Sequence, residues 1–244
     1  MIVKIPVANM YGPDAELICD QLLYGWNVKP VTVTERLALV EAPMRYRGYV
    51  NLGDFTGKRY EANYRICTLC AGAYKEPTFK SAEHFTLFMG SLVKATAYEK
   101  EGFREIEGTS GDRFYVHSKS LESIDSRFDA DKIIKCAKLF LGTPYKWGGK
   151  TALGIDCSGF VAMCYNACGI ELYRDADPSM QIGERVSFEN LEKADLIYLK
   201  GHVGLYVGNG IVVHASWKEG KVCFTELSDF LSLGEPVCAM RIAR

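Results

Sequence analysis

At 244 residues, with 48% apolar residues, 24% charged residues and a net charge of −1, the chain has the composition of an ordinary globular protein. It has no long run of one charge sign, which disfavours a nucleic-acid partner or adsorption to a charged surface. No stretch reaches the ~18 consecutive apolar residues of a membrane-spanning helix. We therefore expect neither nucleic acid nor a membrane as a partner.

The N-terminus and the cysteines predict the compartment. The first residues, MIVKIPVANMYGPD, contain no apolar run long enough for a signal peptide. Nine cysteines, an odd number, without such a signal are typical of reduced thiols in a cytosol. We expect a cytoplasmic protein that is a monomer; secretion after removal of a leader is the alternative.

The first half of the chain alternates short β segments with turn residues. NVKPVTV and RLALVEA belong to one series, and YRICTLC and DRFYVHS to a second. Each series has about 60 residues, close to the smallest size at which a barrel folds alone. The sequence therefore predicts one small β domain over residues 1–64 and another over 65–125.

Helical periodicity begins near residue 126. The spacing of apolar residues predicts a helix over 129–141 and another over 157–168, with Asp156 as the N-cap of the second. A loop rich in Gly and aromatic residues connects them. From residue 194 the chain again reads as strands, so helices followed by a strand meander predict an α+β domain over 126–244.

Three residues of this last domain form a candidate reaction centre. Cys157 lies at the first turn of a predicted helix, where unpaired N–H groups and the helix dipole favour a thiolate. A cysteine nucleophile needs an imidazole as base and a third group that orients it. His202 and His214, on neighbouring predicted strands, could supply both.

Each of these residues also has a structural interpretation. A helix cysteine among apolar neighbours is usually a small core residue, which fits Cys136, Cys164 and Cys168 well. A lone strand histidine is more often a hydrogen-bonded structural group, and we interpret His84 and His117 in that way. The catalytic interpretation gains weight because two of only four histidines fall on one predicted hairpin.

Two further motifs are decoys. Residues 149–151, Gly-Lys-Thr, resemble the end of a phosphate-binding loop, but Pro144 stands where that loop needs its first glycine. Cys67 and Cys70 have the spacing of half a zinc site, without a second matching pair. We therefore expect no metal ion and no cofactor.

Four motifs in order resemble the NlpC/p60 family of bacterial cell-wall peptidases over about residues 130 to 242. They are PYKWGG from Pro144, IDCSGF from Ile155, HVGLYVGNG from His202, and His214-Ala215. The resemblance implies a papain-like catalytic domain with helices packed on an antiparallel sheet. The first half is similar, less strongly, to two small bacterial SH3-like β-barrels.

The resemblance also implies roles for individual residues. Cys157 would be the nucleophile, His202 the base and His214 the orienting group, with Tyr145 beside the oxyanion. Residues implied to bind substrate are Asp156, Ser158, Tyr46, Asp175 and Trp147. Ala176 stands where some family members have a serine hydroxyl.

The implied substrate is a stem peptide of peptidoglycan, cut between γ-linked D-glutamate and an L-diamino acid. Members with SH3-like domains favour a free N-terminal L-Ala. Two carboxylates, Asp156 and Asp175, would attract its ammonium group, and a charge-assisted hydrogen bond contributes about 1.5 to 3 kcal/mol. Free fragments such as L-Ala-γ-D-Glu-diamino acid would then be preferred over intact wall, which suits peptide recycling.

Other functions remain open at this stage. The chain could be a non-catalytic module that binds wall fragments, or an N-acetylmuramoyl-L-alanine amidase with the same Cys-His core. A zinc hydrolase lacks suitable ligand spacing near the two histidines.

The triad makes a prediction about strand register. Residues paired across a hairpin share a face of the sheet. A regular two-residue turn at Asn209-Gly210 would place His202 and His214 on opposite faces. A three-residue loop or a β-bulge would bring them onto one face, so we predict a shifted register.

Overall fold

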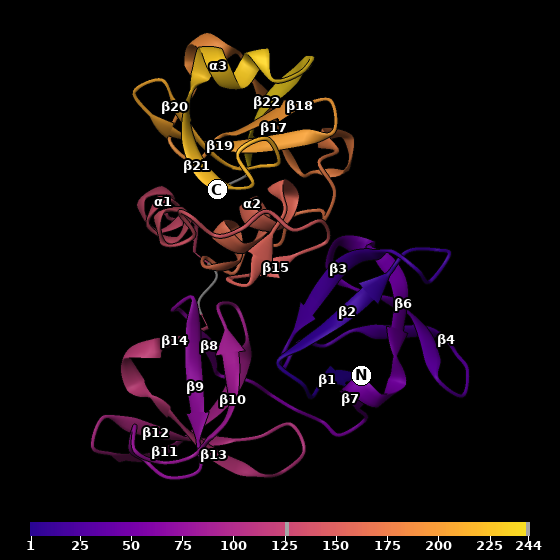
Figure 1. Cartoon of the computed structure of the whole chain (residues 1–244), viewed down its shortest axis with the longest axis vertical. Coiled ribbons are helices and arrows are strands. Elements are labelled where there is room, and N and C mark those ends of the chain that lie inside the picture. Colours follow the sequence, from indigo (N-terminus) through magenta and orange to yellow (C-terminus); the bar gives the residue numbers. More distant parts are fainter. Residues whose placement is uncertain (125–126, 243–244) are drawn as a thin grey trace. The chain divides into compact units, whose positions relative to one another are not determined.

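The computed structural model describes residues 1–124 and 127–242, which form two compact units, 1–124 and 125–244 (Figure 1). The predicted boundary between residues 125 and 126 lies outside the described residues. Both units contain more strand than helix, and the described α-helices all belong to the second unit. Within the described residues, no helix has both the length and the hydropathy needed to cross a membrane.

The first unit contains two larger sheets, each with its own apolar core. One sheet has the strand order β3-β2-β6-β5-β4. Its strands are β2 (Val7–Tyr11), β3 (Ile18–Leu23), β4 (Lys29–Val33), β5 (Leu37–Glu41) and β6 (Arg47–Asn51), with a separate pair formed by β1 (Ile2–Val3) and β7 (Phe55–Thr56). Strands β2, β5 and β6 alternate buried and more exposed residues, as expected for strands with one face in a core.

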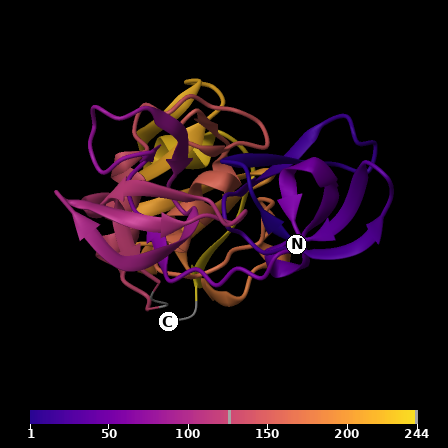
Figure 2. The same ribbon diagram turned by 90° about the horizontal axis from the view of Figure 1, so that it is seen from below.

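The other sheet of the first unit has the order β10-β9-β13-β12-β11-β8-β14. Its strands are β8 (Tyr64–Ile66), β9 (Cys70–Tyr74), β10 (Glu83–Phe88), β11 (Leu92–Lys100), β12 (Phe103–Glu107), β13 (Arg113–His117) and β14 (Leu121–Ser123). These strands, magenta in both views, curve around their own core (Figure 2). The identification of either sheet as SH3-like stays a prediction.

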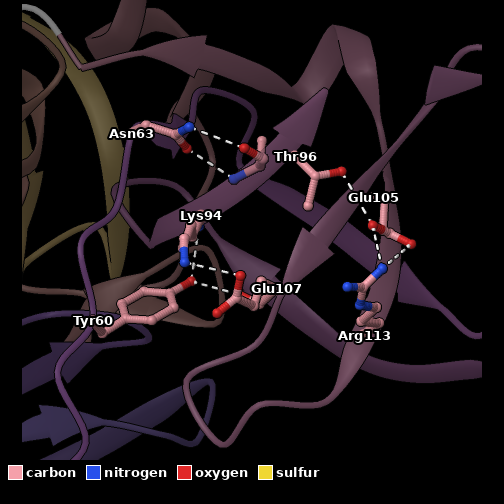
Figure 3. Close-up of polar contacts among 8 residues, drawn as sticks. Tyr60, Asn63, Lys94, Thr96, Glu105, Glu107 and Arg113 are labelled. Atoms are coloured by element: carbon pink, nitrogen blue, oxygen red, sulfur yellow. Dashed lines mark hydrogen bonds and ion pairs between the residues drawn. The ribbon is translucent and has the colours of Figure 1, made fainter. Parts of the chain in front are cut away.

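The predicted domain boundary between residues 64 and 65 falls inside β8, and the preceding segment is already attached to the second sheet. The Tyr60 hydroxyl accepts a hydrogen bond from Lys94 N at 2.8 Å, and the Asn63 side chain makes two bonds with the backbone of Ala95 (Figure 3). An asparagine amide can imitate a peptide group in this way, which pairs the segment with β11 before β8 begins. These side-chain contacts were not predicted, because they join residues more than 30 positions apart.

A short segment after β3 joins the two cores of the first unit. Tyr24 is buried in the core of the second sheet, and its carbonyl accepts from Leu92 N at 2.8 Å. Gly25 has a φ of +78°, and a β-carbon there would lie 1.9 Å from the Leu92 carbonyl oxygen. Only glycine allows the two backbones to approach this closely.

The second unit packs two helices on one six-stranded antiparallel sheet of order β17-β22-β18-β19-β20-β21. The strands are β17 (Gly183–Val186), β18 (Leu196–Leu199), β19 (His202–Gly208), β20 (Ile211–Ser216), β21 (Lys221–Glu226) and β22 (Pro236–Ile242), with a small separate pair of β15 (Lys150–Thr151) and β16 (Gly154–Ile155). The helices are α1 (Ala130–Leu139), α2 (Cys157–Asn166) and the short α3 (Leu227–Ser232). This is the predicted arrangement of helices followed by a strand meander.

Capping residues place both longer helices where the sequence predicts them. The Asp129 side chain accepts from Lys132 N, and the Asp156 side chain accepts from Gly159 N. Each helix ends two residues earlier than predicted, at the C-terminus, where helices commonly fray. Helix α2 contacts β19 and β20, so its N-terminus is held near the two histidine-bearing strands.

We predict that Gly25→Ala lowers the free energy of unfolding of the first unit by about 2 to 5 kcal/mol, because a positive φ and a backbone overlap both oppose the new methyl group. Faster hydrogen exchange at the amides of Tyr24 and Leu92 would report the loss. Gly57→Ala is the matched control, since nothing lies within 4 Å of a β-carbon there. Equal exchange in the two variants would contradict the prediction.

Candidate active site

Cys157 is the first residue of α2 and is 7% exposed. The backbone N–H groups of Val203 and Ser158 lie near its sulfur and act to lower the pKa of the thiol. The thiol therefore lies between the first turn of α2 and the start of β19. Because Val203 directly follows His202, this contact holds the sulfur at the strand that carries the proposed base.

His202 and His214 form a buried pair, with 3% and 1% of their surfaces exposed. The Nε2 atom of His202 lies 2.8 Å from Nδ1 of His214, a hydrogen-bond distance. The buried ring of Phe230 from α3 packs on both imidazoles, with centroid distances of 5.6 and 5.0 Å. Trp217 stands nearly perpendicular to His202 at 4.8 Å. The aromatic neighbours thus fix the orientation of both rings.

A β-bulge brings the two histidines together. Leu205 pairs with Val213, but Gly208 pairs with Ile211, so β19 contains one extra residue between these pairs. The turn residues Asn209 and Gly210 both have positive φ, which is the conformation of a two-residue hairpin turn. The predicted register shift is confirmed in its bulge form.

Burial changes the ionisation of all three groups. It raises the pKa of the Cys157 thiol to about 11, with the nearby Asp156 carboxylate adding to the effect. It lowers the pKa of His202 to about 3 and that of His214 to about 4. The helix N-terminus alone favoured a thiolate in our sequence analysis, but desolvation outweighs it. At pH 7 these shifts favour a neutral thiol and two neutral imidazoles.

Asp156 and Ser158 are both hydrogen-bonded to Arg174, a residue that we did not predict as part of the site. Arg174 donates to both carboxylate oxygens of Asp156 at 2.9 and 2.7 Å, and to the Ser158 hydroxyl at 2.8 Å. The same carboxylate caps α2 through Gly159 N and accepts from Gly148 N. All three side chains are buried. The charge of Asp156 is therefore matched within the protein, and its attraction for a substrate ammonium is smaller than we expected.

Tyr145 lies near the thiol on the loop that precedes α2. Its backbone N–H donates to the Gly220 carbonyl at 2.8 Å, which holds the loop against the segment before β21. Burial, with Cys157 and Asp156 close by, raises the pKa of its phenol to about 12. The phenol therefore keeps its proton and can donate a hydrogen bond to a developing oxyanion.

The remaining predicted binding residues are less enclosed. Trp147 is 70% exposed, and Asp175 is also exposed, next to Arg174. Tyr46 belongs to the first unit, at the end of the 3-10 turn Pro43–Arg45, where it packs on the apolar core of that unit. The roles of these three residues at the substrate stay predictions.

All nine cysteines are free thiols, including Cys67 and Cys70. Within residues 1–124 and 127–242, no group of three or more His, Cys, Asp and Glu side chains is placed to hold a metal ion. The groups that the described site offers for chemistry are a thiol, two imidazoles, a phenol and backbone N–H groups.

Comparison with known proteins relates the chain to a family of peptidases. Residues 142–234 match the model of the NlpC/P60 family. The chain is 30% identical to a dipeptidyl-peptidase 6 of Lysinibacillus sphaericus, over 93% of this chain and 92% of that protein. It is 34% identical to a gamma-D-glutamyl-L-lysine dipeptidyl-peptidase of Bacillus subtilis, over 50% of this chain and 44% of that protein.

The fold resembles a solved structure over its whole length. A crystal structure of an NlpC/P60 family protein from Bacillus cereus superposes with a TM-score of 0.85, covering 100% of this chain and 99% of that chain. The sequence identity is 22%, so this likeness concerns the fold.

We predict that iodoacetamide modifies Cys157 slowly at neutral pH and that the rate rises steadily between pH 5 and 9. The reason is that only the thiolate reacts, and its fraction grows as pH approaches the raised pKa. Mass spectrometry of the Cys157 peptide measures the rate, with exposed Cys70 as the internal control for reagent strength. A rate plateau below pH 7 would instead indicate a preformed thiolate–imidazolium pair.

Proposed function

The chain belongs to the NlpC/P60 family, and on this basis we propose that it is a cysteine endopeptidase that cuts the γ-D-glutamyl-L-diamino acid bond of peptidoglycan stem peptides. The observation that carries the proposal is the 2.8 Å contact between His202 Nε2 and His214 Nδ1, beside a thiol at the N-terminus of α2. This arrangement provides a nucleophile, a base and an orienting group.

The proposed reaction starts from the neutral thiol. His202 takes the thiol proton on Nδ1, because its Nε2 is engaged with His214. The sulfur then attacks the scissile carbonyl carbon, and the negative charge moves to the carbonyl oxygen. The Tyr145 hydroxyl and the Cys157 backbone N–H donate to that oxygen, the latter from the first helical position where no intrahelical acceptor exists.

Collapse of this intermediate expels the amine of the diamino acid, which receives the proton from His202. The acyl group remains on the sulfur as a thioester. A water molecule then gives a proton to His202 and attacks the thioester, which releases the carboxylate product and restores the thiol.

Preference for a free N-terminal L-Ala is the finer part of the proposal. The similar proteins of Lysinibacillus sphaericus and Bacillus subtilis are both named dipeptidyl-peptidases, which supports release of a dipeptide. We place the substrate ammonium at the exposed carboxylate of Asp175. Asp156 and Ser158 supply further hydrogen-bonding atoms, but Arg174 bonds to both and already balances the charge of Asp156.

We further propose a role in recycling wall peptides in the cytosol. Nine free thiols suit a reducing compartment. A need for a free amine would exclude stem peptides still joined to the glycan, where the L-Ala nitrogen is an amide. Incubation with L-Ala-γ-D-Glu-diamino acid tripeptide and with intact sacculi tests both points by mass analysis. An endopeptidase releases L-Ala-D-Glu, an amidase releases L-Ala still joined to its peptide, and a binding module releases nothing.

We predict that Cys157→Ala lowers hydrolysis of the tripeptide by roughly 10⁴-fold or more with little loss of stability, because covalent catalysis is removed. Cys164→Ala is the matched control. It should retain activity and lose about 1 to 3 kcal/mol of unfolding free energy, because its side chain is fully buried against Cys136. Rates and urea denaturation are measured for both variants. Substantial activity in Cys157→Ala would refute the proposed nucleophile.

We predict that acetylation of the tripeptide amine lowers kcat/KM roughly a hundredfold. The substrate loses a charge-assisted hydrogen bond, which contributes about 1.5 to 3 kcal/mol. Asp175→Asn should lose most of this discrimination through a lower rate on the free peptide. Equal rates on free and acetylated peptides would contradict the assigned ammonium site.

A further inference from the structure

His214 has a second polar contact on the side of its ring away from His202. Its Nε2 atom lies 3.1 Å from the hydroxyl oxygen of Thr225 and 4.0 Å from the sulfur of Cys223. Both residues belong to β21, which pairs with β20 in a regular register. Cys223 is directly opposite His214, and Thr225 is opposite Val212, two residues away. All of these side chains therefore share one face of the sheet.

The proton positions on the rings of His202 and His214 depend on one another. His202 can accept the thiol proton on Nδ1 only if its Nε2 carries the hydrogen that is shared with His214. That hydrogen needs an acceptor, so Nδ1 of His214 must be unprotonated. In a neutral imidazole the proton of His214 then sits on Nε2, facing Thr225. The opposite tautomer of His214 would turn His202 into an Nδ1–H donor that cannot act as a base.

We propose that Thr225 is a positioning residue: its hydroxyl oxygen accepts the Nε2 proton of His214 and thereby keeps His202 in the tautomer that can deprotonate Cys157. The proposal rests on the proposed function, because it assigns the base role to His202. It adds Thr225 as a fourth group to Cys157, His202 and His214. Thr225 touches neither the thiol nor the substrate in this role.

Two observations favour Thr225 over Cys223 as the acceptor. The oxygen contact of 3.1 Å is a hydrogen-bond distance, and a thiol sulfur is a weak acceptor.

The test compares Thr225→Val with Thr225→Ser, and uses Cys223→Ala as a control beside the same histidine. Valine keeps the shape of threonine but has no acceptor, whereas serine restores the oxygen. We expect Thr225→Val to lower kcat about tenfold with KM changed less than about twofold, the effect of one neutral hydrogen bond on an orienting group. Thr225→Ser should recover most of the rate, and Cys223→Ala should match the wild type.

A second readout needs no substrate. Nitrogen-15 NMR distinguishes the two imidazole tautomers, and the chain has only four histidines, with His84 and His117 as internal references. We expect the Nε2–H form of His214 in the wild type and in Thr225→Ser, and a mixture of tautomers in Thr225→Val. If the enzyme does not cut the tripeptide at all, the proposed function fails while this spectrum still tests Thr225.

Three results would overturn the inference. An unchanged tautomer and an unchanged kcat in Thr225→Val would show that the hydroxyl has no influence on His214. A loss in Thr225→Ser as large as that in Thr225→Val would indicate a packing role for the threonine methyl group. A tautomer change in Cys223→Ala would assign the acceptor to the sulfur instead.

Discussion

One extra residue in a hairpin decides whether this site can exist. Side chains alternate across a sheet, so the register between β19 and β20 determines whether His202 and His214 share a face. The bulge between Tyr206 and Gly208 supplies the needed shift, and Gly208, with a φ of +98°, accommodates it. The 2.8 Å contact between the rings and the shared packing of Phe230 both depend on this shift.

Burial then governs how the site is charged. A thiolate and an imidazolium formed in the resting enzyme would have to be desolvated, and the pKa shifts of Cys157 and His202 both favour the neutral forms. In the proposed mechanism, charge separates only when a substrate carbonyl is present to receive the negative charge. The backbone N–H groups at the start of α2 and the protonated Tyr145 phenol are the donors proposed for that charge.

Much of this arrangement was predictable, because it depends on local rules. Asp129 and Asp156 mark the helix starts, and strand alternation alone required a shifted register at Asn209-Gly210. The pairing of Arg174 with Asp156 was not predictable from spacing, since 18 residues separate them and a neighbouring Asp175 looked equally functional. The contact of the segment before β8 with β11 was not predicted for a related reason. It depends on the side chains of Tyr60 and Asn63, which bond to a distant strand, and such contacts leave no periodic pattern in the sequence.

Asp156, paired with Arg174, caps helix α2 and also changes the pKa of the neighbouring thiol. The Asp156 carboxylate raises the pKa of the Cys157 thiol, so a buried aspartate here opposes ionisation of the proposed nucleophile. Yet the same carboxylate caps α2, holds the Gly148 backbone of the preceding loop and fixes Arg174. The guanidinium offsets its charge and lowers the thiol pKa in return. Removal of Arg174 alone would leave an unpaired buried carboxylate next to Cys157, which damages both the fold and the ionisation of the nucleophile. The pair therefore lets a strong helix cap stand beside a reactive thiol.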